Sequence, residues 1–397
     1  MDCPHRGGGG DERKAGVGDI LADHAGSLRL SGHRARVVHH LVACRTGELG
    51  GHLEECDRCG HRRLAYHSCR DRHCPRCGSL DQALWAEAQE QSLLPVPYFH
   101  VVFTVPISLH PFFRRAPALA LDLLFDAVAE TLLELTHRNW GARIGFSSVL
   151  HTWSQKLLLH PHIHCLVPGG GLSDDGQRWI GCDPAFLLPY KALRSVFRGK
   201  LLHKLEAAHS DNRFGLAWPF GKQLLESAAR QRWVIYAKPP LAGPQQVVRY
   251  VSRYTRKIAI SNSRILDYDG TNVRIRWRDR AHGNRPDVLP LSGLEFARRF
   301  VLHILPPHFV RIRHYGLLAN RVRQRSLARC RALISGGKIS LPLPKHVKED
   351  RVAACLRLFG KDPSLCPACG QGRMHRRDDW RPAPRFHSHA DSLPRPP

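Results

Sequence analysis

Two copies of one cysteine string constrain this chain more than any other feature. They are Cys56-Asp57-Arg58-Cys59-Gly60 and Cys74-Pro75-Arg76-Cys77-Gly78. Two residues between the cysteines let both sulfurs reach one tetrahedral ion, and the glycine permits a tight turn. The surrounding stretch, residues 44–78, is too polar to fold on an apolar core alone. The sequence therefore predicts a zinc-binding module whose ligands are Cys56, Cys59, Cys74 and Cys77; the alternative is a set of buried cysteines without metal.

Other potential ligands leave the number of ions open. Cys44, His67, Cys69 and His73 lie close to the two strings and could supply a second ion, or Cys44 and Cys69 could simply pack beside the first. A third string, Cys366-Pro367-Ala368-Cys369-Gly370, has His375 as its nearest other ligand. It reads either as a further zinc site or as an unpaired half-site in a tail.

The charge balance indicates the class of partner. Sixty Lys and Arg face 34 Asp and Glu, a net charge of +26, while 43% of residues are apolar. The apolar share excludes a disordered chain, and the charge favours nucleic acid over a small-molecule substrate. No secretory signal and no run of about 18 apolar residues is found, so we expect no membrane partner and a cytoplasmic, nucleoid-associated protein. In that compartment the thirteen cysteines favour metal binding over disulfides.

Hydrophobic periodicity predicts an α+β fold, because strands and helices are interleaved. Strands are expected at 98–105, 146–153, 162–167, 233–237, 263–268 and 272–278, and helices at 27–42, 79–94, 117–138, 190–209 and 244–257. The predicted organisation is a disordered segment 1–25, a zinc-binding and DNA-contacting domain 27–95, an α+β domain 97–290, a basic helical region 291–370 and a disordered tail 371–397.

A histidine-rich strand is the first candidate for catalysis. In His160-Pro161-His162-Ile163-His164, alternate residues share a face, so the imidazoles of His162 and His164 can converge on one cation. A divalent ion needs a further ligand, for which His160, Gln155, His100 and an unidentified carboxylate are candidates. The alternative is a surface strand that carries histidine by chance.

A predicted helix after Pro244 is the second candidate. Tyr250 and Tyr254 lie four residues apart on one face, a spacing that also suits a core stripe. Cations surround the pair, namely Arg249, Arg253, Arg256 and Lys257. A tyrosine hydroxyl has a pKa near 10, so it attacks phosphorus only where positive charge stabilises the phenolate. These cations favour a nucleophilic role and contact with DNA phosphates.

The order of these features resembles the rolling-circle transposases of the insertion-sequence 91 family, in the HUH nuclease superfamily. The similar strings are Ser68 to Cys77, His100 to Pro106, His160 to Gly171 and Tyr250 to Ile265. The resemblance implies an antiparallel sheet backed by helices, related to the ferredoxin and RNA-recognition topology. It also implies Mg²⁺ or Mn²⁺ on His162 and His164, Tyr254 and Tyr250 as nucleophiles, and zinc on the N-terminal cysteines. The implied activity is cleavage and rejoining of single-stranded DNA through a tyrosine link.

Three other functions compete with this interpretation. A plasmid replication initiator or conjugative relaxase shares the histidine pair and the tyrosine, although the cysteine module argues against it. A non-enzymatic zinc protein would only bind DNA. A transposase with three catalytic carboxylates is the weakest alternative, because 34 acidic residues supply chance matches freely.

Overall fold

The computed structural model describes residues 14–30, 32–238, 258–279, 282–336 and 349–380. Its centre is a five-stranded antiparallel sheet with the strand order β13-β5-β6-β3-β9. The strands are β3 (Tyr98–Thr104), β5 (Gly145–Trp153), β6 (Leu159–Pro168), β9 (Ile235–Lys238) and β13 (Ile312–Gly316). The predicted α+β class with an antiparallel sheet is confirmed.

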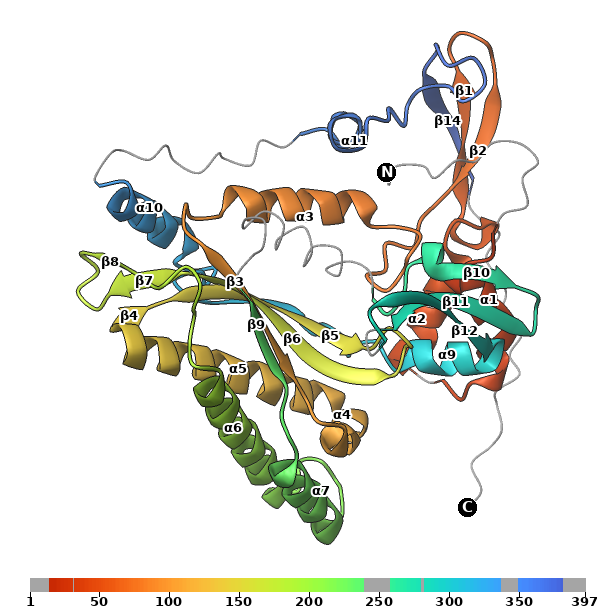
Figure 1. Cartoon of the computed structure of the whole chain (residues 1–397). Coiled ribbons are helices and arrows are strands. Elements are labelled where there is room, and N and C mark those ends of the chain that lie inside the picture. Colours follow the sequence, from red (N-terminus) through yellow and green to blue (C-terminus); the bar gives the residue numbers. More distant parts are fainter. Residues whose placement is uncertain (1–13, 31, 239–257, 280–281, 337–348, 381–397) are drawn as a thin grey trace, which may run out of the picture.

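Helices lie on both sides of this sheet (Figure 1). The long helix α5 (Pro117–Trp140) begins with proline in its first turn, ends at Gly141 in the left-handed conformation, and crosses one face. Beside it lie α4 (His110–Arg115), α6 (Tyr190–Ser210) and α7 (Trp218–Arg230), and α3 (Ser79–Gln91) lies on the other side. The core between them is rich in fully buried aromatic side chains, among them Phe99, Phe103, Phe125, Phe146 and Phe197.

A second lobe combines the N-terminal helices with a three-stranded sheet, at the right of Figure 1. It contains α1 (Val17–His24), α2 (Gly32–Ala43), β10 (Ile265–Tyr268), β11 (Asn272–Asp279), β12 (Arg285–Ser292) and α9 (Gly293–Val301). Ser292 caps α9 by accepting a hydrogen bond from the Glu295 amide. The lobe and the central sheet share one apolar core.

Two smaller sheets complete the structure. One, here called the ribbon, has the order β14-β1-β2 and consists of β1 (Gly51–Cys56), β2 (Arg62–Tyr66) and β14 (Met374–Trp380). The other consists of β4 (Ala142–Arg143), β7 (Gly170–Ser173) and β8 (Trp179–Gly181). The last two helices are α10 (Arg323–Ile334) and α11 (Arg351–Phe359). Within the described residues, no helix has both the length and the hydropathy that a bilayer crossing demands.

The structure corrects three of the predicted boundaries. Residues 17–24 are not disordered but form α1, because Val17, Ile20 and Leu21 make a short apolar face that is fully buried. Residues 374–380 are not disordered but form β14, whose mostly charged side chains conceal a strand held by pairing with β1. The region 291–370 is not a separate helical unit, since β13 is an edge strand of the central sheet.

Candidate active site and metal centres

Three histidines converge on one face of the central sheet. His162 and His164 lie on β6, as the alternation predicts, and His151 lies opposite His162 on the neighbouring strand β5. One ring nitrogen from each of the three lies within 4.8 Å of the others. Among the described residues, no carboxylate joins this group. The structure thus provides a third potential ligand, His151, that sequence reasoning missed.

The three named candidates for that third ligand have other contacts. The Nε2 of His100 lies 2.7 Å from Nδ1 of His164, which places His100 behind the cluster. The His160 carbonyl accepts a hydrogen bond of 2.6 Å from Nδ1 of His162. The side chain of Gln155 accepts a hydrogen bond from the Arg278 amide on β11. The pairing of β5 with β6 would have identified His151, but register is not visible in hydropathy.

The hydrogen bonds leave suitable donor atoms for a metal. Since Nδ1 of His162 donates to the His160 carbonyl, its Nε2 keeps a lone pair. Burial lowers the pKa of His100 to about 4, and it lowers the pKa of His151 well below its usual 6.5. Neutral imidazoles are the form that binds metal. Three imidazole nitrogens gathered in this way fit a divalent ion, and imidazole binds transition metals better than it binds Mg²⁺.

The predicted tyrosine helix lies outside the described residues. This applies to Tyr250 and Tyr254 and to the cations Arg249, Arg253, Arg256 and Lys257. The preceding strand β9 pairs with β3 at an edge of the central sheet. The next described residue, Ile258, is buried.

The structure divides the four predicted zinc ligands between two clusters. Cys74 and Cys77 gather with Cys44 and Cys69, whereas Cys56 and Cys59 gather with Cys366 and Cys369. The single site expected from the sequence does not form. The reason is the β1–β2 hairpin, which carries Cys56 and Cys59 at its turn, whereas Cys69, Cys74 and Cys77 follow its base.

The first cluster, Cys44, Cys69, Cys74 and Cys77, has the geometry of a zinc site. Sγ of Cys69 lies 3.7 Å from Sγ of Cys77, and a tetrahedron with Zn–S bonds of 2.3 Å has sulfur–sulfur edges of about 3.8 Å. Backbone amides of Cys69 and Asp71 donate to Cys44 and Cys69 sulfurs. Thiol contacts, that of Cys69 first, lower the pKa of Cys44. These features suit a bound thiolate.

The other two candidates for a second ion do not join this cluster. Nδ1 of His67 contacts the Leu49 carbonyl at 3.1 Å. Nδ1 of His73 donates to the Asp71 carboxylate at 2.7 Å, and its Nε2 accepts a hydrogen bond of 3.1 Å from the Leu305 amide. His73 is therefore a structural link and not a ligand.

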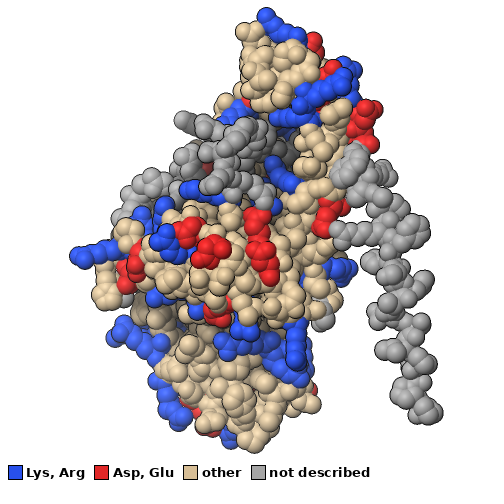
Figure 2. Space-filling model, turned by 90° about the vertical axis from the view of Figure 1, so that its right-hand side faces the viewer, with Lys and Arg blue, Asp and Glu red and all other residues tan. Residues whose placement is uncertain are grey.

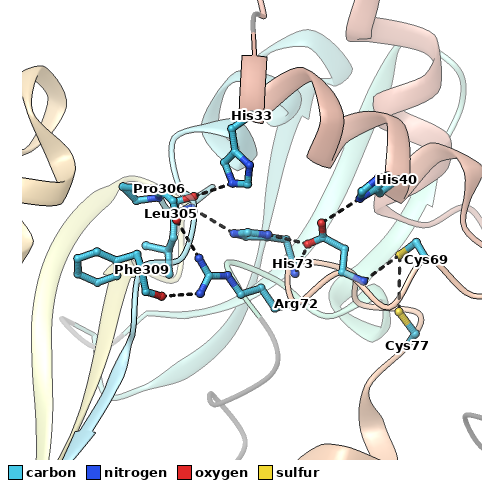
Figure 3. A network of polar contacts seen from close by, with 10 residues as sticks. His33, His40, Cys69, Arg72, His73, Cys77, Leu305, Pro306 and Phe309 are labelled. Atoms are coloured by element: carbon cyan, nitrogen blue, oxygen red, sulfur yellow. Dashed lines mark hydrogen bonds and ion pairs between the residues drawn. The ribbon is translucent and has the colours of Figure 1, made fainter.

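That link is part of a network that fastens the first cluster to the central sheet (Figure 3). Arg72 donates to the carbonyls of Phe309 and Pro306 at 2.5 and 2.9 Å, and His33 contacts the Leu305 carbonyl at 3.1 Å. Residues 305–309 lead directly into β13. The cysteine module is thus hydrogen-bonded to the segment that positions an edge strand of the sheet with the histidine cluster.

Basic side chains are distributed widely over the surface. Figure 2 shows Lys and Arg from the tip of the molecule to its lower half, with acidic side chains gathered mainly at mid-height. Such a distribution suits contact with phosphates at several places, in keeping with the net charge of +26.

Comparisons with known proteins point in one direction. A family model described as "Putative transposase" matches residues 145–326, and one described as "Transposase zinc-binding domain" matches residues 18–105. The chain is 47% identical to "Putative transposase y4qJ" of Sinorhizobium fredii, over 90% of this chain and 94% of that protein. It is 31% identical to "Transposase for insertion sequence element IS801" of Pseudomonas savastanoi pv. phaseolicola, over 84% of this chain and 81% of that protein.

A solved structure of the conjugative relaxase TrwC in complex with oriT DNA also aligns. The alignment covers 39% of this chain and 68% of that chain, at 17% identity and a TM-score of 0.22. A TM-score this low does not establish a shared fold.

Proposed function

We propose that this chain, which belongs to the insertion-sequence 91 family of transposases, nicks and rejoins single-stranded DNA through a tyrosine–phosphodiester intermediate during rolling-circle transposition. The observation that carries the proposal is the convergence of His151, His162 and His164 on one face of the sheet, within residues 145–326 that the transposase model matches. These three imidazoles would hold a divalent ion, which would supply Lewis-acid activation of a DNA phosphate.

His151, His162 and His164 would hold a divalent ion beside the scissile phosphate. A divalent ion in that position withdraws charge from the phosphate and makes phosphorus more electrophilic. His162 is oriented by the His160 carbonyl and His164 by His100, so both rings are fixed before DNA arrives. No large rearrangement of these ligands is then required at the moment of reaction.

In the proposed step the hydroxyl of Tyr254 attacks phosphorus. A bond forms between the tyrosine oxygen and phosphorus, the bond from phosphorus to the 3′ oxygen breaks, and the proton lost by tyrosine is balanced by the one gained by the 3′ hydroxyl. The new phosphodiester keeps the energy of the old one, so a 3′ hydroxyl can later attack it without ATP. Tyr250 would accept a second strand while the first link persists.

Positive charge would hold the strand. Arg249, Arg253, Arg256 and Lys257 flank the tyrosines in the sequence, and they would stabilise the phenolate as well as contact phosphates. The cysteine module would bind the ends of the element, and the nucleoid is the expected place of action.

A covalent-adduct assay tests the proposal. Full-length protein is mixed with single-stranded DNA from both strands flanking its gene, with Mn²⁺ or Mg²⁺, and a denaturing gel reports protein-linked DNA. We expect an adduct that is lost in the Tyr250→Phe/Tyr254→Phe variant and on chelation. The matched control Tyr190→Phe, on α6, should keep it.

Two outcomes would contradict the proposal. Binding of the strand without any adduct under every metal tested would favour a DNA-binding protein without nuclease activity. An adduct formed only on a plasmid origin or transfer origin, and never on element ends, would favour a replication initiator or relaxase.

A further inference from the structure

The second cysteine cluster joins distant parts of the chain. We propose that Cys56, Cys59, Cys366 and Cys369 bind a second zinc ion, which clasps the C-terminal segment to the N-terminal module. The matched zinc-binding domain spans residues 18–105, so half of this ligand set lies far outside it. The two sulfur pairs are 307 and 313 residues apart in sequence.

The distances between the sulfurs fit a metal rather than disulfides. Sγ of Cys56 lies 3.8 Å from Sγ of Cys369, and Sγ of Cys59 lies 3.7 Å from Sγ of Cys366. Both values match the edge of about 3.8 Å for tetrahedral zinc with four thiolates. A disulfide would need about 2.05 Å, and all four cysteines are free.

The backbone around the two cysteine pairs is matched. The Gly60 amide donates to the Cys56 carbonyl at 3.2 Å, and the Gly370 amide donates to the Cys366 carbonyl at 3.0 Å. Both glycines have positive φ, +69° and +64°, which other residues rarely adopt.

Each turn also directs backbone amides at a cysteine sulfur. In the first turn, the amides of Arg58 and Cys59 donate to Sγ of Cys56. The Gly372 amide does the same for Cys369 at 3.3 Å. Two turns of this kind face each other across the cluster.

Strand pairing brings the two turns together. β14 pairs with β1, so that Met374 lies opposite Cys56 where β1 ends. The Asp57 carboxylate accepts a hydrogen bond of 2.8 Å from the Arg373 amide, and the Asp57 amide donates to the Arg373 carbonyl at 3.1 Å. The C-terminal cysteines are therefore held in register with the hairpin by backbone contacts independent of the sulfurs.

The ion would stabilise the ribbon, because few of the ribbon's described apolar side chains are buried. Among the side chains that the structure describes, the apolar cluster at its end has Cys56, Cys366 and Met374 as buried members, with Cys369 packed against them. Leu64 and Tyr66 on β2 are exposed by 45% and 44%. A small sheet without an apolar core is commonly stabilised by structural zinc, whose binding energy becomes folding energy.

The number of zinc ions bound per chain tests the proposed second site. The starting protein is the full-length chain with His162→Ala and His164→Ala, so that zinc bound by these histidines is not counted. Elemental mass spectrometry then measures the zinc and iron content per chain. We expect two zinc ions. Adding Cys366→Ser/Cys369→Ser should lower the content to one, and Cys56→Ser/Cys59→Ser should do the same. The control Cys182→Ser, a free cysteine outside both clusters, should keep two.

A glycine variant provides a test that leaves all ligands in place. A Cβ on Gly372 would collide with Sγ of Cys56 and with the Cβ of Arg58. Gly372→Ala should therefore speed the release of one zinc ion to a chelator by about 10-fold or more, with the other ion unaffected. One zinc per chain in the starting protein would overturn the proposal. So would an unchanged content after Cys366→Ser/Cys369→Ser, or iron in place of zinc.

Discussion

At the scale of single residues, His164 depends on His100. The two rings are stacked with centroids 5.0 Å apart, and their nitrogens share one proton over 2.7 Å. If His164 presents Nε2 to a metal, its Nδ1 must carry that proton, and Nε2 of His100 is the acceptor. A histidine on β3 thereby sets the tautomer of a ligand on β6 without touching the ion.

This dependence predicts the effect of His100→Ala. Mn²⁺ affinity should fall by about 10- to 100-fold, as is typical when a partner of a metal ligand is removed. Isothermal titration calorimetry on the full chain measures it directly, without DNA. The control His137→Ala, at an exposed position on α5, should bind as the starting protein does. Equal affinity in the His100 and His137 variants would show that His100 is not needed to orient the ligand.

Residue spacing predicted which residue types gather at these sites, but not which residues make up each cluster. Period-two alternation predicted that His162 and His164 share a face, because this follows from one strand alone. His151 was missed, because its place depends on the register between β5 and β6. The Cys-x-x-Cys strings likewise predicted that cysteines would gather in clusters, but which string pairs with which depends on the length of the β1–β2 hairpin and on β14.

At the scale of elements, hydrogen bonds from Arg72 connect the first cysteine cluster to the segment that precedes β13. Arg72 satisfies the carbonyls of Pro306 and Phe309, whose segment carries the chain into the sheet. Arg72→Ala should leave both carbonyls without that partner and lower the free energy of unfolding by about 1–3 kcal/mol. Urea denaturation measures it, with Arg70→Ala, an exposed neighbour, as the control. Indistinguishable midpoints for the two variants would exclude a structural role for these hydrogen bonds.

Helices and strands with a clear hydrophobic periodicity were predictable from the sequence. Strands that form mainly by pairing with a neighbouring strand were not. The helix over 117–138 and the strands over 98–105 and 146–153 correspond to α5, β3 and β5. By contrast, β13 (Ile312–Gly316) includes arginine and histidine and lies in a region whose charge suggested helix. Its place at the sheet edge comes from pairing with β5, and the hydropathy pattern of the sequence does not predict that pairing.

At the scale of the whole molecule, buried histidines make stability depend on pH. Burial lowers the pKa of His303 and of His314 to about 4. In the unfolded chain such groups titrate near 6.5, so below that pH the unfolded state binds protons that the folded state does not. Stability is therefore fully present above pH 6.5 and is lost as the pH falls toward 4, by up to roughly 3 kcal/mol for each fully shifted histidine.

One substitution isolates this effect from the protonation of metal ligands. His303 is fully buried between the Thr152 hydroxyl and the Leu157 carbonyl. His303→Gln should reduce the dependence of the unfolding free energy on pH between 6.5 and 4, whatever it does to the absolute value. The exposed His282→Gln should leave the slope as it is. Parallel pH profiles for the two variants would refute the assignment.

The sheet order β13-β5-β6-β3-β9 also has a consequence for synthesis on the ribosome. The histidine-bearing strands β5 and β6 end by residue 168, so they are synthesised early. The strand that pairs with the outer edge of β5 is synthesised only at residues 312–316. During that interval the nascent chain has an open edge next to His151. A messenger cut short before that point would yield a polypeptide with His151, His162 and His164 but an incomplete sheet. Premature termination should therefore produce fragments whose central sheet has an unpaired edge at β5.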